Sequence, residues 1–209
     1  MGKTVSLNLR RISGNLVREA AETVLASGVI LYPTDTIYGL GCDAFNAKAI
    51  DRIFRIKRRA EAKPTLLLVR NREMLRELVE EITPVARLLM KRFWPGPLTL
   101  VFRAQAKINP MISAGTPTVG IRIPDNAFCL KLIEACGKPL VSTSANISDR
   151  PAVRDMKSLI RNFGDKVDLF IDAGRLATSR PSTVVDVSGG EIIVIREGAI
   201  KKSSLLSLL

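Results

Sequence analysis

The sequence predicts an α/β domain with a mixed, largely buried β-sheet. Short apolar runs such as Val29–Pro33 (VILYP) and Thr65–Val69 (TLLLV) are typical of strands that are covered on both faces. Segments with apolar residues at helical spacing separate several of these runs. The last two runs are joined by SGGE, which favours a hairpin and therefore an antiparallel pair. Helices that alternate with buried strands indicate an α/β fold.

The individual elements follow from the same two patterns. In the first expected helix, Asn15–Ser27, residues Leu16, Ala20 and Val24 recur at helical spacing, and Gly28 provides a stop. The polar, glycine-rich stretch Pro33–Gly41 is expected to be a loop. Further helices are expected at Lys48–Lys57, Arg72–Val79, Pro84–Phe93, Ala127–Ala135 and Asp155–Phe163, and further strands at Leu98–Arg103, Thr118–Ile123, Leu140–Thr143, Leu169–Asp172, Thr183–Val187 and Ile192–Arg196.

The chain reads as one domain. It has 209 residues without a repeat or a low-complexity linker, so a single domain over residues 1–209 is expected. Within it, residues 1–12 are expected to form an N-terminal segment, and residues 201–209 (KKSSLLSLL) a short tail that docks as a helix. With 46% hydrophobic residues, the chain is able to build a full core.

The cysteines and the hydropathy of the sequence indicate the cellular compartment in which the protein is expected. The three cysteines, Cys42, Cys129 and Cys136, form no CxxC pair, which favours reduced thiols. No run has the length of a signal-peptide core or a membrane span. We therefore expect a soluble, cytoplasmic protein with no membrane partner.

The ionisable residues limit the kinds of catalysis and the kinds of partner that are expected. The sequence contains no histidine, which excludes serine–histidine and cysteine–histidine catalysis and histidine-ligated metals. Its formal net charge of +12 favours polyanionic partners, either nucleic acid or nucleotides and phosphorylated metabolites. Bulk charge alone does not choose between them.

The densest charge cluster lies at the end of an expected helix. Arg52–Lys63 (RIFRIKRRAEAK) has six basic residues, and Lys57 and Arg59 fall where the helix gives way to the loop before the next strand. A solvated helix face is one interpretation. The other is a phosphate site, because fixed cations at the end of an element are suited to bind phosphate oxygens.

Two other segments present polar groups after buried strands. The loop Pro33–Gly41 (PTDTIYGLG) offers hydroxyls at Thr34, Thr36 and Tyr38. Its continuation GLGCDA approaches a dinucleotide fingerprint, but Glu61 in a basic run is a poor ribose partner, and no P-loop is present. Several further strands also end in hydroxyls, an amide or arginines, which predicts that they meet at one cleft; these residues are Arg122, Ser142, Ser144, Asn146, Ser182 and Arg196.

Taken together, these motifs resemble the YrdC-type threonylcarbamoyl-adenylate synthases. The matching segments run from about Tyr32 to Gly198 and are YPTDTIYGLGCDA, IKRRAEAKP, FWPGPLTLVF, TVGIRIPD, PLVSTSANIS, PSTVVDV and IREG. The resemblance implies a twisted mixed sheet with surrounding helices and a large basic concave cleft. It also implies a reaction in which L-threonine, bicarbonate and ATP, accompanied by Mg²⁺, give threonylcarbamoyl-AMP and pyrophosphate for the N6-threonylcarbamoyladenosine modification of tRNA.

The resemblance also implies roles for particular residues. Lys57 and Arg59 would be catalytic, and the motif positions imply no dedicated metal-ligand cluster. Threonine would contact Thr34, Lys57, Arg122 and Ser182. ATP would contact Arg59, Lys63, Thr118, Ser142, Ser144, Asn146 and Arg196. The implied partners besides the substrates are tRNA or double-stranded RNA and a threonylcarbamoyl-transferase protein.

The sequence departs from the family pattern at two positions and in length. Ala60 stands where proline is common, and Leu68 stands where many members carry a polar residue near the threonine. Longer members also have an additional C-terminal domain, so a partner protein or the N-terminal segment would have to close the cleft here.

Two alternative functions stay open from the sequence. One is a double-stranded RNA- or tRNA-binding module of the same fold without synthase activity, which the charge of +12 favours. The small number of Tyr and Trp residues argues against a platform that stacks single-stranded bases. The other alternative is a relative that keeps the fold and has lost the activity.

Overall fold

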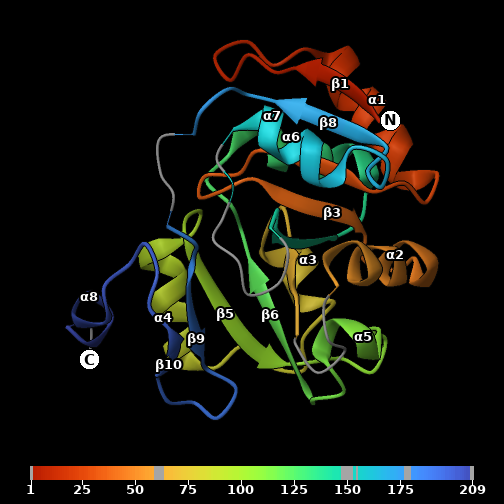
Figure 1. Ribbon diagram of the computed structural model, residues 1–209. Coiled ribbons are helices and arrows are strands. Elements are labelled where there is room, and N and C mark those ends of the chain that lie inside the picture. Colours follow the sequence, from red (N-terminus) through yellow and green to blue (C-terminus); the bar gives the residue numbers. More distant parts are fainter. Residues whose placement is uncertain (1, 59–63, 147–152, 154, 177–179, 208–209) are drawn as a thin grey trace.

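The computed structural model describes residues 2–58, 64–146, 153, 155–176 and 180–207 (Figure 1). These residues form a ten-stranded sheet in the order β1-β8-β2-β3-β7-β4-β6-β5-β9-β10. The strands are β1 (Lys3–Ser6), β2 (Ile30–Tyr32), β3 (Gly39–Asp43), β4 (Leu66–Leu68), β5 (Leu98–Arg103), β6 (Thr118–Arg122), β7 (Leu140–Ser144), β8 (Leu169–Asp172), β9 (Thr183–Asp186) and β10 (Ile193–Arg196).

The sheet is mixed, as the sequence predicts. Strands β1, β8 and β2 pair in parallel, as do β4 with β6 and β5 with β9. The pairs β2–β3, β3–β7, β7–β4, β5–β6 and β9–β10 are antiparallel. The last of these pairs confirms the predicted hairpin.

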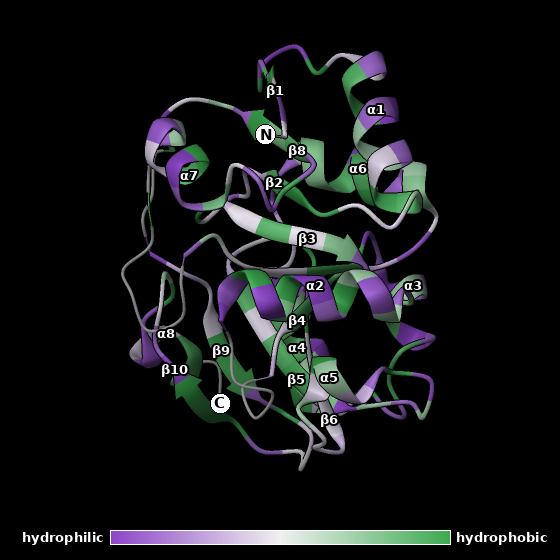
Figure 2. Ribbon diagram, turned by 45° about the vertical axis from the view of Figure 1, so that its right-hand side comes forward, coloured by the Kyte–Doolittle hydropathy of each residue, from purple (hydrophilic) through white to green (hydrophobic). Residues whose placement is uncertain are grey.

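Eight helices are present in the described part of the chain. They are α1 (Gly14–Leu25), α2 (Ala47–Lys57), α3 (Arg72–Arg76), α4 (Pro84–Phe93), α5 (Pro110–Ser113), α6 (Ala127–Cys136), α7 (Met156–Phe163) and α8 (Lys202–Leu206). Figure 2 shows polar and apolar bands alternating along α1 and α2, the pattern of a helix with one buried side.

Each face of the sheet carries its own core. On one face, α2, α4 and α7 pack against strand residues such as Leu31, Val141 and Ile121. On the other face, α1 and α6 cover Ile30, Tyr32 and neighbouring residues of β8, β7 and β4. Successive strand residues alternate between the two cores because side chains along a strand point to opposite faces. The prediction of an α/β fold with a largely buried sheet is therefore confirmed.

The structure adds elements that the sequence patterns do not indicate. Strand β1 lies in the N-terminal segment, at one edge of the sheet, and pairs with β8. The short helix α5 follows β5. The expected tail helix is present as α8, which buries Leu205 completely.

Two sequence predictions are wrong at their ends. The helix expected at Arg72–Val79 ends at Arg76, and Val79 forms a bridge with Ala104 instead. The other is the loop expected at Pro33–Gly41. Residues 33–38 form a loop, but Gly39 and Gly41, which the sequence pattern places in that loop, belong to β3, where every residue is buried. Strand β3 lies between β2 and β7 in the sheet. The motif GLGCDA is therefore a central strand and not a phosphate-binding turn.

Candidate functional site

A cavity of about 540 Å³ lies over the part of the sheet that α1 and α6 leave uncovered. Its floor includes one row across four neighbouring strands: Leu66, Gly120, Val101 and Asp186 are register partners in that order. Residues that alternate with these, such as Val119, Ile121 and Val185, point into the opposite core. One face of the sheet thus forms the floor of the cavity, and most of the residues that line the cavity are small or polar.

Arg122, at the end of β6, is the most deeply buried arginine at this cavity. Its Nη1 lies 3.1 and 3.2 Å from the two carboxylate oxygens of Asp35, and the side chains are only 4% and 9% exposed. Within the described residues, Arg122 Nε has no hydrogen-bond partner. A buried polar group without a partner is costly, so this edge of the guanidinium is suited to an anionic ligand in the cavity.

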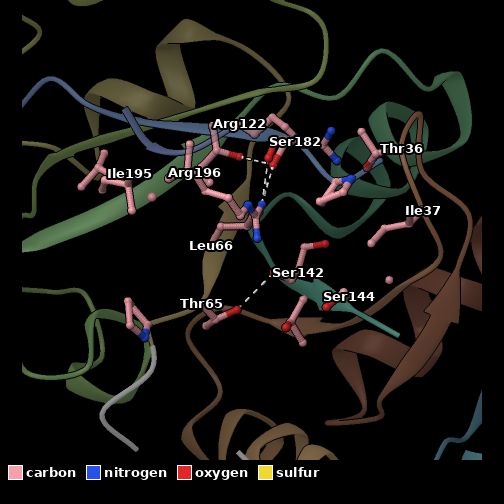
Figure 3. A pocket seen from close by; sticks show the side chains of 18 of the residues that line it. Thr36, Ile37, Thr65, Leu66, Arg122, Ser142, Ser144, Ser182, Ile195 and Arg196 are labelled. Atoms are coloured by element: carbon pink, nitrogen blue, oxygen red, sulfur yellow. Dashed lines mark hydrogen bonds between the residues drawn. The ribbon is translucent and has the colours of Figure 1, made fainter. Parts of the chain in front are cut away.

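Arg196 supplies a second guanidinium from β10. Its Nη2 donates to the carbonyl of Ser182 at 2.8 Å (Figure 3). The hydroxyl of Ser182 lies 2.8 Å from that of Thr99. Burial, and secondarily the charge of Arg122, lower the pKa of Arg196. A guanidinium nevertheless remains protonated at neutral pH, so two positive groups act on the same space.

Lys57 forms a polar cluster on the opposite side of the cavity. It is the last residue of α2 and is 1% exposed. Its Nζ donates to the carbonyl of Ser144, and it lies 3.4 Å from the Ser144 hydroxyl and 3.2 Å from Asn146 Oδ1. The Ser144 hydroxyl also donates to Asn146 Oδ1. A single ammonium therefore holds the end of β7 together with Asn146.

The loop before β3 uses its hydroxyls mainly to hold its own shape. Thr34 Oγ1 donates to the carbonyl of Ile37 at 2.7 Å and accepts from the amides of Thr36 and Ile37. The hydroxyl of Tyr38 donates to the carbonyl of Gly174 at 2.7 Å and accepts from the Ala173 amide at 3.0 Å. The expectation that Tyr38 offers its hydroxyl to a ligand is therefore wrong, because that group fixes the loop against the segment after β8.

The structure brings most of the predicted site residues together. Figure 3 shows Arg122, Ser182 and Arg196 on one side of the cavity, and Ser142 and Ser144 on the other. Lys57 contacts two of the lining residues. Arg59 and Lys63 lie outside the described residues, as does Ala60. The predicted residues that line the cavity are Thr34, Thr118, Arg122, Ser142, Ser144, Asn146, Ser182 and Arg196.

Leu68 lies beside Arg122, with which it is in register. It is fully buried in the core under α1 and α6, together with Cys129 and Leu140. The position where many family members carry a polar group is thus part of the apolar core next to Arg122, and it is not among the residues that line the cavity.

Several lining residues are not among those that the sequence predicts. Thr99, Gly120 and Asp186 each sit between apolar neighbours on a strand. Their signal is a period-two alternation of small or polar with large apolar residues, as in TVGIR of β6. That signal predicts a face without a hydrophobic cover, but it does not distinguish bulk solvent from a cavity.

In the described part of the chain, no group of three or more Cys, Asp or Glu side chains is placed to hold a metal ion. Of the helices described, none has both the length and the apolar character needed to cross a membrane.

The fold and the cavity define an α/β protein with a candidate ligand site, lined in part by Arg122 and Arg196, over the part of one sheet face that α1 and α6 leave uncovered. Residues 22–198 match the model of the Sua5/YciO/YrdC family, which is described as "Telomere recombination". The chain belongs to this family.

Similar proteins agree with this assignment. The chain is 35% identical over 198 residues to the threonylcarbamoyl-AMP synthase of Pyrococcus abyssi. The aligned region covers 94% of this chain and 58% of the relative. It is 34% identical over 177 residues to a threonylcarbamoyl-AMP synthase of Coxiella burnetii, with 85% and 95% covered. The crystal structure of P. abyssi Sua5 complexed with L-threonine superposes with a TM-score of 0.95 at 32% identity, covering 99% of this chain and 61% of the other. The chain therefore spans less than two thirds of the Pyrococcus protein.

Proposed function

We propose that this chain is an L-threonylcarbamoyladenylate synthase, which makes threonylcarbamoyl-AMP and pyrophosphate from L-threonine, bicarbonate and ATP. The observation that carries the proposal is one cavity with Arg122 and Arg196 on one side and, on the other, Ser144 and Asn146, which the ammonium of Lys57 contacts. A reaction that joins an amino acid to a nucleotide needs two anion sites facing one space. The relatives named as synthases and the threonine complex of the Pyrococcus protein support the choice of substrates.

The threonine end of the site is assigned to Arg122. Asp35 holds the guanidinium through Nη1, and Nε has no hydrogen-bond partner among the described residues, which would suit a carboxylate ligand. Thr34 and Ser182 line the same cavity and would contact the rest of the amino acid. Leu68, in register with Arg122, belongs to the apolar core and would leave this end of the site without the polar contact that many family members have.

The nucleotide end is assigned to the cluster around Lys57. Its ammonium, fixed by Ser144 and Asn146, would lie between the amino acid and the phosphates. Thr118, Ser142 and Arg196 would contact the nucleotide, and Arg59 and Lys63 would add further positive charge. Mg²⁺ would arrive with the ATP phosphates, which it commonly does without a protein cage, and the side-chain oxygens of Ser144 and Asn146 are the groups nearest to that role.

The proposed chemistry consists of two steps. Bicarbonate first carboxylates the amino group of threonine and releases water. A carbamate oxygen then attacks the α-phosphorus of ATP, and the bond to pyrophosphate breaks. The residues contribute position and charge neutralisation rather than a covalent nucleophile, which agrees with the absence of histidine from the sequence.

Pyrophosphate release tests this proposal. Purified protein with ATP, Mg²⁺ and bicarbonate is expected to release pyrophosphate only when L-threonine is added. The control omits threonine, and a second control replaces it with D-threonine. Equal release with and without L-threonine would contradict the proposal.

The charge of +12 supports a second candidate, a module that binds tRNA or double-stranded RNA without synthase activity. Binding by charge alone would weaken steeply between low and physiological salt. A protein that binds tRNA in this way, but neither binds ATP nor releases pyrophosphate, would favour this candidate over the synthase.

A further inference from the structure

We propose that Tyr32 is a positioning residue of this site, and that it orients the hydroxyl of Ser142 so that the hydroxyl proton is donated to the nucleotide in the cavity. The identity of that ligand rests on the proposed function. The positioning role itself is argued from contacts across β2, β3 and β7. These contacts involve the glycines of the motif GLG in β3, which the proposed function does not explain.

Tyr32 reaches Ser142 across an intervening strand. Tyr32 is the last residue of β2, Ser142 lies on β7, and β3 runs between them. The Tyr32 hydroxyl donates to Ser142 Oγ at 2.9 Å, and Tyr32 is completely buried. The aromatic ring therefore crosses the backbone of β3 on the face of the sheet that carries the cavity.

Gly41 makes this crossing feasible. A Cβ at Gly41 would lie 2.7 Å from Cε1 of Tyr32 and 3.2 Å from its hydroxyl, as well as 2.9 Å from the carbonyl of Val141. At Gly39, on the same face, a Cβ would lie 3.3 Å from Ser142 Oγ. The two glycines of GLG thus leave room for the tyrosine ring and for the serine hydroxyl, which is a packing reason for the motif.

The direction of the hydrogen bond decides where the serine proton goes. Burial raises the pKa of Tyr32, so the phenol stays neutral and keeps its proton to donate. Ser142 Oγ is the acceptor in this bond, and a hydroxyl that accepts retains one proton of its own. Within the described part of the chain, no group accepts that proton, and Ser142 lines the cavity. The proton is consequently available to an acceptor atom of a bound ligand.

The alternative is that Tyr32 is only a core aromatic whose hydroxyl needs a partner. In that case its removal lowers stability, and any effect on ligand binding is independent of Ser142. The two interpretations are distinguished by a double-mutant cycle on binding of Mg²⁺–ATP to the full chain, measured by calorimetry without threonine.

We expect Tyr32→Phe to weaken ATP binding about three- to tenfold, which corresponds to the loss of one oriented hydrogen bond. Ser142→Ala is expected to weaken it at least as much. The double variant should bind no more weakly than Ser142→Ala, because Tyr32 acts through the hydroxyl that is already absent. Gly41→Ala, which displaces the ring but keeps the phenol, should show the same dependence on Ser142.

Tyr38→Phe is the matched control. It also removes a buried tyrosine hydroxyl, but that group contacts Gly174 and Ala173. The factor by which Tyr38→Phe changes the affinity for ATP should be the same whether or not Ser142→Ala is also present. If the Tyr32→Phe and Ser142→Ala factors multiply instead, or if Tyr32→Phe leaves ATP binding unchanged, the positioning role is overturned. A protein with the expected cycle that releases no threonine-dependent pyrophosphate would contradict the proposed function and leave the positioning role standing.

Discussion

Two basic side chains at the cavity, Lys57 and Arg122, are almost fully buried. Each has specific partners, since a buried charge without them would destabilise the fold. Asp35 neutralises Arg122, whereas the carbonyl of Ser144 and the amide oxygen of Asn146 hold Lys57. Both of these contacts fix the position of the ammonium.

Replacement of Lys57 by methionine should abolish most of the activity while the protein stays folded. The side chain keeps its length, but the positive charge next to the proposed phosphates is lost, for which we expect a decrease in turnover of about 100-fold or more. Pyrophosphate release and circular dichroism measure the two effects. The control is Lys3→Met, which removes an exposed charge on β1 and should leave turnover unchanged. Wild-type turnover in Lys57→Met would exclude Lys57 from the catalytic group.

Asp35→Asn should destabilise the protein strongly. The substitution keeps the shape of the side chain but leaves the buried charge of Arg122 without its counterion, which costs about 3 kcal/mol of unfolding free energy. Urea unfolding measures this loss. The exposed Asp125→Asn is the control and is expected to change the unfolding free energy by less than about 0.5 kcal/mol. Similar values for the two variants would mean that the Asp35–Arg122 pair contributes little to the fold.

Helix α2 is the element that places Lys57. Its first turn is capped by Asn46, whose Oδ1 accepts from the amide of Ala49 at 3.1 Å. Asn46 also donates to the hydroxyl of Ser27 at 2.6 Å and so ties the helix to the segment after α1. At the other end, Arg58 adopts a left-handed conformation with φ of 49°, which ends the helix directly after Lys57. Both helix ends therefore determine where the ammonium lies.

Asn46→Ala should lower the unfolding free energy by about 1–2 kcal/mol, because both a helix cap and a bond to Ser27 are lost. The apolar side of α2, with Ile50 and Ile53, still fixes the helix against the sheet, so turnover should persist at low temperature. The matched control is Asn162→Ala in α7, an exposed helical position where alanine should be neutral or slightly stabilising. Thermal unfolding that shows no difference between the two variants would contradict the capping role.

At the scale of the whole molecule, residues from both halves of the chain line the same cavity. The lining includes residues of β3, β4, β5, β6, β7, β9 and β10 and of the loop before β3. A ligand that contacts all of these segments at once binds the folded chain much more tightly than the unfolded chain. Such a ligand therefore raises the free energy of unfolding.

Ligands should accordingly raise the melting temperature. At about 100 times its Kd, a ligand adds about 2.7 kcal/mol, which corresponds to a shift of roughly 5–10 °C for a chain of this size. We expect ATP with Mg²⁺ and L-threonine to raise it separately and to raise it further together. Differential scanning fluorimetry measures the shift, with GTP and D-threonine as controls. A shift that is the same for L- and D-threonine would argue against a threonine-specific site.

Much of the secondary structure and the chemical class follow from local sequence patterns. Apolar runs and helical spacing predict most strands and helices, and the absence of histidine by itself excludes imidazole chemistry. Polar residues at the ends of strands predict a shared site, and eight of the predicted site residues do line one cavity. These features are local, because side-chain periodicity and residue chemistry depend on only a few neighbouring residues.

Tertiary structure decides everything that depends on strand order. The sequence patterns place GLG in a loop, yet its glycines serve a tyrosine and a serine on the strands at either side, about 110 positions apart in the chain. Asp35 and Arg122 meet only because the loop after β2 lies over β6. The cavity itself exists because α1 and α6 cover only part of one sheet face. Periodicity tells which side of a strand is apolar, but it carries no information about which strand lies beside it or what covers that side.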